Sequence, residues 1–160
     1  MSEIFICYRA DDDRFAALLV EDRLRAVFGH DNVFIDRAGV PAAVRDEAIA
    51  GCAVVLPLIG KHWVRLRGAS GGRRIDDPAD FVVAGLAAAL AAGTRVLPVL
   101  LNGAPMPGGA ELPPALRALT TCHPVRLRSR TSNADLAYLA EKVSFSVQEI
   151  EDRRLVIPNR

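Results

Sequence analysis

The residues best suited to chemistry follow short apolar segments. Tyr8, Arg9 and the acidic run Asp11–Asp13 come directly after the apolar segment 4–7, and Asp36 ends a later one. A carboxylate stabilises developing positive charge, whereas tyrosine and arginine can contact a nucleotide. The acidic run itself would repel a phosphate. We therefore look for a site where these segments meet.

Other reactive residue types are isolated. The histidines are His30, His62 and His123, and the cysteines are Cys7, Cys52 and Cys122. No histidine has a nucleophile at a useful spacing, so a hydrolase triad is not indicated. The cysteines lack CxxC spacing, which argues against zinc and against a disulfide framework, and Cys7 is predicted to lie in the core. The segment 68–77 is glycine-rich but lacks the lysine and Ser/Thr of a phosphate loop.

Composition excludes several classes of function. The 160 residues suit one domain, and a content of 51% hydrophobic but 6% aromatic residues predicts an aliphatic core. The 20 basic and 19 acidic residues nearly cancel, and no basic run exceeds two residues, so we expect neither nucleic acid nor an anionic membrane as partner. The apolar run 81–92 is too short to span a bilayer. We see no signal peptide and expect a cytoplasmic protein.

Strand and helix patterns alternate along one domain, 1–160. Strands are predicted at 3–9, 32–36, 53–60, 95–103 and 124–128, and helices at 11–29, 44–52, 115–119 and about 132–154, with one more inside 76–93. In that last helix Asp77 is expected to cap, Pro78 to start the first turn and Gly93 to close the end. Gly85 stands in its middle, where glycine costs about 1 kcal/mol relative to alanine.

This alternation predicts an α/β fold with a flavodoxin-like, five-stranded parallel sheet of order 2-1-3-4-5 and helices on both faces. Such sheets bind ligands beyond the carboxyl ends of their strands, near the point where the strand order reverses. Here that rim is formed by the segments 8–13, 36–41, 60–63 and 102–104. A functional site is expected there.

Three families with this architecture can be compared at the rim. A phosphate-binding flavodoxin needs a Ser/Thr/Gly-rich loop after the first strand, but this chain has "YRADDDRF". A two-component receiver shares the acidic residues, but it also needs an aspartate at the end of the third strand, where this chain reads "LIGKHW". Neither family fits.

The segment "IFICYRADDDRFAALLVEDRLRAVFGHDNVFID" resembles the start of bacterial Toll/interleukin-receptor (TIR) domains. The resemblance continues through "AGCAVVLPLIGKHW", "DDPADFVVAGLAAALAAGTRVLPVLLNGAPMP" and "ELPPALRAL", and it covers residues 3–128. TIR domains are signalling or immune modules. Some release nicotinamide from NAD, and others only assemble with partner TIR domains.

The resemblance implies a glutamate that this chain lacks. Hydrolytic TIR domains carry their catalytic glutamate on the helix after strand three, and the alignment on "DFVVAGLAAAL" places Gly85 there. No glutamate occurs between Ala48 and Ala110. On a helix, Asp80 points about 140° away from position 85, and it is expected to serve the helix start. We therefore assign no catalytic residue.

The loop after strand two departs from the family as well. TIR domains carry a Pro-Pro-Gly-like turn there that closes over the ligand and mediates assembly. This chain keeps Val40 and Pro41 without the Pro-Gly, and the following helix is shorter. By the resemblance, Val40 and Pro41 join Tyr8, Arg9 and Asp36 at the nucleotide pocket. For Arg9 an ion pair with Asp36 is the alternative role.

Trp63, after strand three, is either a packing anchor or a surface on which a base stacks. The leading functional hypothesis is a degenerate TIR module that assembles with other TIR domains or recognises a nucleotide, with no cofactor required and NAD or a related nucleotide as the ligand. The competing hypothesis is an active NAD glycohydrolase with non-standard residues. The partner, the pathway and the oligomeric state do not follow from the sequence.

Overall fold

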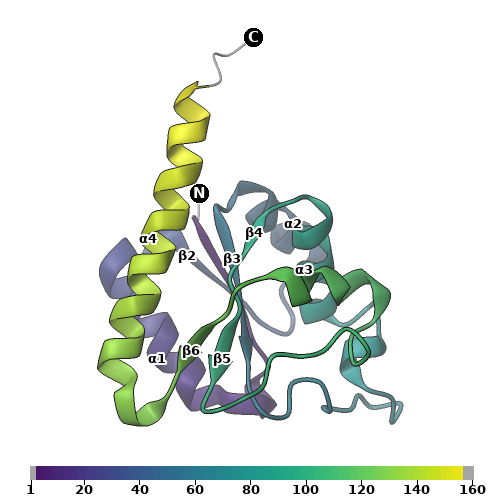
Figure 1. Ribbon diagram of the computed structural model, residues 1–160. Coiled ribbons are helices and arrows are strands. Elements are labelled where there is room, and N and C mark those ends of the chain that lie inside the picture. Colours follow the sequence, from purple (N-terminus) through teal and green to yellow (C-terminus); the bar gives the residue numbers. More distant parts are fainter. Residues whose placement is uncertain (1–2, 157–160) are drawn as a thin grey trace.

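The computed structural model describes residues 3–156 (Figure 1). Its strands are β1 (Ile4–Cys7), β2 (Val33–Asp36), β3 (Val54–Ile59), β4 (Arg95–Val96), β5 (Val99–Leu101) and β6 (Val125–Leu127). All pair in parallel, in the order β2-β1-β3-β5-β6, with β4 beside β3. Since β4 and β5 together form the expected fourth strand, the predicted order 2-1-3-4-5 is confirmed.

The expected strand 95–103 is broken in two, and two prolines explain the break. The β3–β4 ladder pairs Val55 with Val96, and pairing resumes between Leu58 and Val99. Pro57 and Pro98 lie in this gap on the two sides. Proline has no N–H to donate to a ladder, so it is tolerated where the ladder is interrupted.

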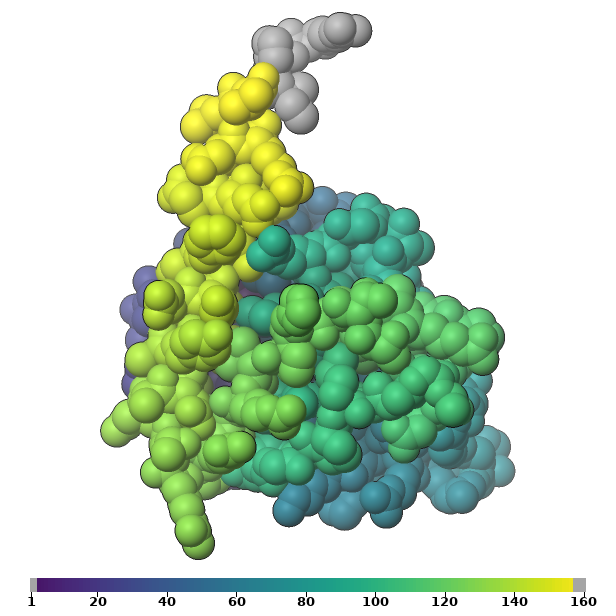
Figure 2. Space-filling model, in the orientation of Figure 1, coloured from purple at the N-terminus to yellow at the C-terminus, as the bar shows by residue number. Residues whose placement is uncertain are grey.

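Two layers of helices cover the sheet (Figure 1). The α-helices are α1 (Ala10–Phe28), α2 (Ala42–Gly51), α3 (Phe81–Ala91) and α4 (Ser132–Val156), and the 3₁₀ segments are η1 (His30–Asn32), η2 (Arg74–Asp76), η3 (Pro114–Thr121) and η4 (Ser129–Thr131). α1 and α4 pack on one face, and α2, α3 and η3 pack on the other. The end of α4 extends beyond the body (Figure 2). None of the helices within residues 3–156 is long and apolar enough to cross a membrane.

The start of α3 differs from the prediction. Asp80 is the N-cap residue, and its Oδ1 accepts hydrogen bonds from the backbone N–H groups of Val82 and Val83, each at 3.1 Å. Asp77 does not cap the helix; its Oδ1 accepts the N–H of Ala79 in the preceding turn, at 2.9 Å. Gly93 follows the helix with a φ of +70°, as expected for a left-handed end.

Asp12 holds the loop after β3 against the start of α1. Its Oδ2 accepts the N–H of Gly60 at 2.7 Å, and its Oδ1 accepts the N–H of His62 at 2.9 Å. A Cβ at residue 60 would lie 2.5 Å from Asp12 Oδ1, so any larger residue there would have to displace this carboxylate. Burial raises the pKa of Asp12, although the N–H groups of His62 and Gly60 oppose that rise.

The neighbouring aspartates reach other segments. Asp13 accepts a hydrogen bond from Asn102 Nδ2, at 2.9 Å, and its other oxygen accepts the N–H of Ala16 at a kink in α1. Asp11 forms an exposed ion pair with Arg74. The acidic run therefore joins the ends of β1, β3 and β5, which form the rim.

We predict that Asp12→Asn lowers the free energy of unfolding by about 1–3 kcal/mol, because an amide offers one acceptor to two N–H donors and leaves one unsatisfied. Chemical denaturation followed by circular dichroism measures this. Asp11→Asn is the matched control, since its exposed ion pair contributes about 0–1 kcal/mol. Equal effects of the two substitutions would contradict the assigned role of Asp12.

Candidate functional site

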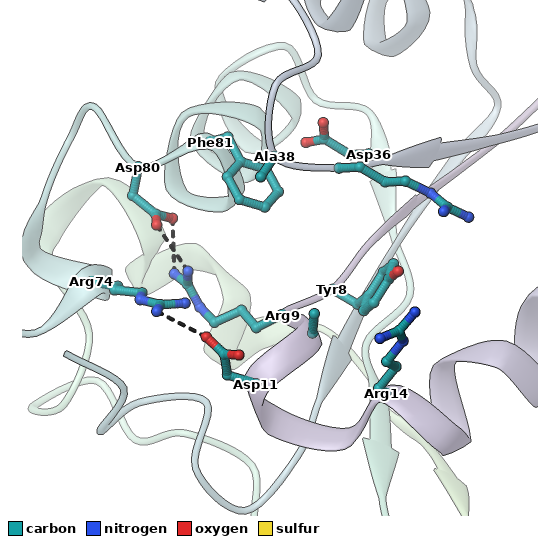
Figure 3. A pocket seen from close by; sticks show the side chains of 11 residues that line it. Tyr8, Arg9, Asp11, Arg14, Asp36, Ala38, Arg74, Asp80 and Phe81 are labelled. Atoms are coloured by element: carbon teal, nitrogen blue, oxygen red, sulfur yellow. Dashed lines mark hydrogen bonds and ion pairs between the residues drawn. The ribbon is translucent and has the colours of Figure 1, made fainter. Parts of the chain in front are cut away.

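A pocket of about 610 Å³ lies at the carboxyl ends of β1 and β2 (Figure 3). Its lining consists of Tyr8, Arg9, Ala10, Asp11, Arg14, Asp36, Arg37, Ala38, Arg74, Asp80 and Phe81. The volume is within the range of small-molecule sites. The pocket therefore occupies the rim at which the topology predicts a site.

The structure separates the predicted site residues into two groups. Tyr8, Arg9 and Asp36 line the pocket, whereas Val40, Pro41 and Trp63 are not among its lining residues. Trp63 is 1% exposed and packs in the core formed with α3 and η3. The sequence allowed two roles for Trp63, packing or base stacking, and this burial agrees with packing.

Arg9 binds a different aspartate from the one expected. It is 2% exposed, and its two Nη atoms donate to the two carboxylate oxygens of Asp80, both at 2.9 Å (Figure 3). The guanidinium also lies 5.9 Å from the centre of the Trp63 ring. The alternative pairing of Arg9 with Asp36 is wrong, because Asp36 has another partner.

That partner is Arg45 on α2. Arg45 Nε donates to both carboxylate oxygens of Asp36, at 3.0 and 2.8 Å, and Arg45 Nη2 donates to the carbonyl of Val40 at 3.3 Å. The two side chains are 7% and 0% exposed. Burial raises the pKa of Asp36, while the hydrogen bonds and charge of Arg45 oppose that rise. Nothing in the sequence pointed to Arg45 beyond the rule that a buried carboxylate needs a partner.

Gly85 faces this ion pair. It is buried on α3, and a Cβ at this position would lie 3.3 Å from Arg45 Cδ, 3.5 Å from Ile49 Cδ1 and 3.7 Å from Asp36 Oδ2. The first distance is shorter than an ordinary van der Waals contact. The missing side chain therefore lets α2 and its arginine pack closely on α3, and Gly85 is not among the pocket's lining residues.

Each carboxylate that lines the pocket already has a guanidinium partner. Asp11 pairs with Arg74, Asp36 with Arg45 and Asp80 with Arg9. Asp80 is further engaged as the cap of α3. Within residues 3–156 no group of three or more His, Cys, Asp or Glu side chains is arranged to hold a metal ion. All three carboxylates in this lining are therefore ion-paired.

The cysteines offer no nucleophile to this site. Cys7 and Cys52 are buried, and burial raises the pKa of Cys7 far above its ordinary value and that of Cys52 to about 11. Thiols in such surroundings remain protonated and unreactive at neutral pH. The burial of Cys7 confirms its predicted place in the core.

Comparison with solved structures shows the fold. The TIR domains in the structure of the activated Roq1 resistosome, which directly recognises the pathogen effector XopQ, are similar with a TM-score of 0.57 and 15% identity, over 96% of this chain and 99% of that chain. A flavodoxin-like domain from Synechococcus sp. is similar with a TM-score of 0.51 and 17% identity, over 93% of this chain and 99% of that chain. Neither a protein-family model nor a curated protein sequence matches the chain.

These similarities confirm the predicted flavodoxin-like α/β fold and include a TIR domain among the structures that share it. At 15% and 17% identity they carry no residue roles. The function must therefore be argued from the pocket.

We predict that Gly85→Glu lowers the free energy of unfolding by about 1–3 kcal/mol, since overpacking costs that much in a close-packed core. This reverses the stabilisation that helix propensity alone predicts. Thermal and chemical denaturation measure the change, and Ala88→Glu, at an exposed position on the same helix, is the comparison. A Gly85→Glu variant as stable as the parent would show that Arg45 moves freely.

Proposed function

We propose that this chain is a TIR-like binding module that recognises a nucleotide in the rim pocket and does not cleave NAD. The TIR-like fold and a pocket of ligand size support the first part. One observation carries the second part: the position aligned with the family's catalytic glutamate is Gly85, and the side chain beside it is the guanidinium-bearing Arg45.

The charges beside Gly85 do not supply what the reaction needs. Cleaving the bond between ribose and nicotinamide develops positive charge on the ribose, which a nearby anion stabilises. Asp36, the nearest carboxylate to Gly85, is paired with the buried guanidinium of Arg45, and the two charges neutralise each other. An unpaired carboxylate is therefore not supplied beside position 85 by the described residues.

Assembly with other TIR domains is the second part of the hypothesis. The similar Roq1 TIR domains belong to a resistosome, which is the observation that favours assembly. The loop between β2 and α2, which we linked to assembly by resemblance, is short here: Arg37–Val40 precede the cap Pro41, and α2 has 10 residues. We therefore propose nucleotide recognition first and assembly, signalling and immunity as its setting.

We predict that the purified protein releases nicotinamide from NAD no faster than a heat-denatured sample over hours. Gly85→Glu should remain equally inactive, because its carboxylate would meet Arg45 before it could reach a ribose. Chromatographic detection of nicotinamide measures both. The missing glutamate is the reason for this expectation, since removing one electrostatic stabiliser lowers a rate on the order of a hundred- to a thousandfold.

Two further variants make this test decisive. Asp80→Asn keeps a side-chain oxygen for capping α3 but removes the charge, and Asp22→Asn, exposed on α1, is the matched control. Nicotinamide release by the parent that Asp80→Asn abolishes and Asp22→Asn preserves would establish the competing hydrolase hypothesis and overturn ours.

A further inference from the structure

The pocket has an uneven distribution of charge. Its lining holds four arginines, Arg9, Arg14, Arg37 and Arg74, and three aspartates, Asp11, Asp36 and Asp80. All three aspartates are bound by guanidinium groups, and the guanidinium of Asp36 comes from Arg45, outside this lining. The charge left to meet a ligand is therefore positive.

Three of the arginines have donors to spare. Arg14 is exposed and makes no hydrogen bond or ion pair within residues 3–156, and Figure 3 shows its guanidinium on the same side of the pocket as Tyr8. Arg37 is 55% exposed and reaches Glu21 only at 3.3 Å, and Glu21 is shared with Arg25. Arg9 and Arg74 are paired with Asp80 and Asp11, but the buried Nε of Arg9 has no hydrogen-bond partner among the described residues.

The pocket also offers flat apolar surface. The rings of Tyr8 and Phe81 border the hollow from different sides (Figure 3). Arg45, which is not among the lining residues, has its Cζ 5.5 Å from the centre of the Phe81 ring. A ligand with a flat ring and an anionic end would meet both kinds of surface, because arginine binds phosphate through charge-assisted hydrogen bonds.

From this arrangement we propose that the pocket selects a nucleotide whose base carries no positive charge and whose phosphate is bound by Arg14 and Arg37. The inference rests on the nucleotide recognition proposed above and adds the class of ligand. A cationic ring such as oxidised nicotinamide finds no free carboxylate here and meets the field of the arginines, so it is disfavoured.

Two matched ligand pairs test the proposal by isothermal titration calorimetry. AMP and adenosine differ by the phosphate, and NADH and NAD⁺ differ in the charge of the nicotinamide ring. We expect AMP to bind at least about tenfold more tightly than adenosine, and NADH more tightly than NAD⁺. The affinity for AMP should fall as salt rises, because the arginines involved are exposed.

Protein variants assign the effect to the pocket. Arg14→Ala should weaken AMP binding about tenfold and leave adenosine unchanged, and Arg14→Lys should restore part of the loss. Arg126→Ala, an exposed arginine on β6, is the matched control and should bind AMP like the parent. Arg14 and Arg126 are both exposed, so neither substitution removes packing from the core.

Several results would overturn the inference: equal affinities for AMP and adenosine, no detectable binding of any of the four ligands, or an Arg14→Ala variant that binds AMP like the parent. The absence of any binding would overturn the proposed nucleotide recognition as well, whereas the other two results leave it standing. Nicotinamide release would overturn the binding-module hypothesis whatever the phosphate selectivity, whereas lost selectivity without nicotinamide release would overturn only the ligand class.

Discussion

The buried ion pair between Asp36 and Arg45 is the constraint on which the site depends. Two charges withdrawn from water are tolerated only when they neutralise each other and their remaining hydrogen-bonding groups find partners. Arg45 meets this requirement with Asp36, with the carbonyl of Val40 and with the ring of Phe81. The pair therefore ties α2 to the end of β2 and to the start of α3, and Gly85 gives it room.

A second set of carboxylates joins the loops of the rim. Asp11, Asp12 and Asp13 are adjacent in sequence, but they bind different segments: Arg74, the loop after β3, and Asn102 after β5. Asn102 has a φ of +49°, and its Oδ1 accepts hydrogen bonds from Ser129 after β6. An acidic run at the end of a strand can thus serve structure entirely, which is why residue types alone do not indicate a metal site.

Periodicity and topology predicted most of the fold. Continuous apolar strands and alternating helices gave the sheet order, and the order placed Tyr8, Arg9 and Asp36 at one rim. The predicted start of α3 was wrong because the sequence offers two good caps. These are Asp77, followed by Pro78, and Asp80, and only packing selects between them. The break between β4 and β5 does have a signal in the sequence, namely Pro57 and Pro98, which both lie where the ladder is interrupted.

The partners of the arginines could not be predicted in the same way. Arg9, Arg45 and Arg74 carry long side chains, and which carboxylate each one meets depends on angles between elements far apart in sequence. Arg9 and Asp80 are separated by 71 positions, and Arg74 and Asp11 by 63. The sequence suggested Arg9 as the partner of Asp36, whereas Asp36 binds Arg45 and Arg9 binds Asp80.

Gly85 and Arg45 have to be considered together. A glutamate at position 85 would require Arg45 to move, and a displaced Arg45 would leave Asp36 buried without its partner, so the three positions are energetically coupled. The glycine is thus more than a missing carboxylate: it is the space into which a positive charge has been packed. Because Asp36 neutralises Arg45, and Arg9 and Arg74 pair with the other two lining aspartates, the positive charge left at the pocket comes from Arg14 and Arg37.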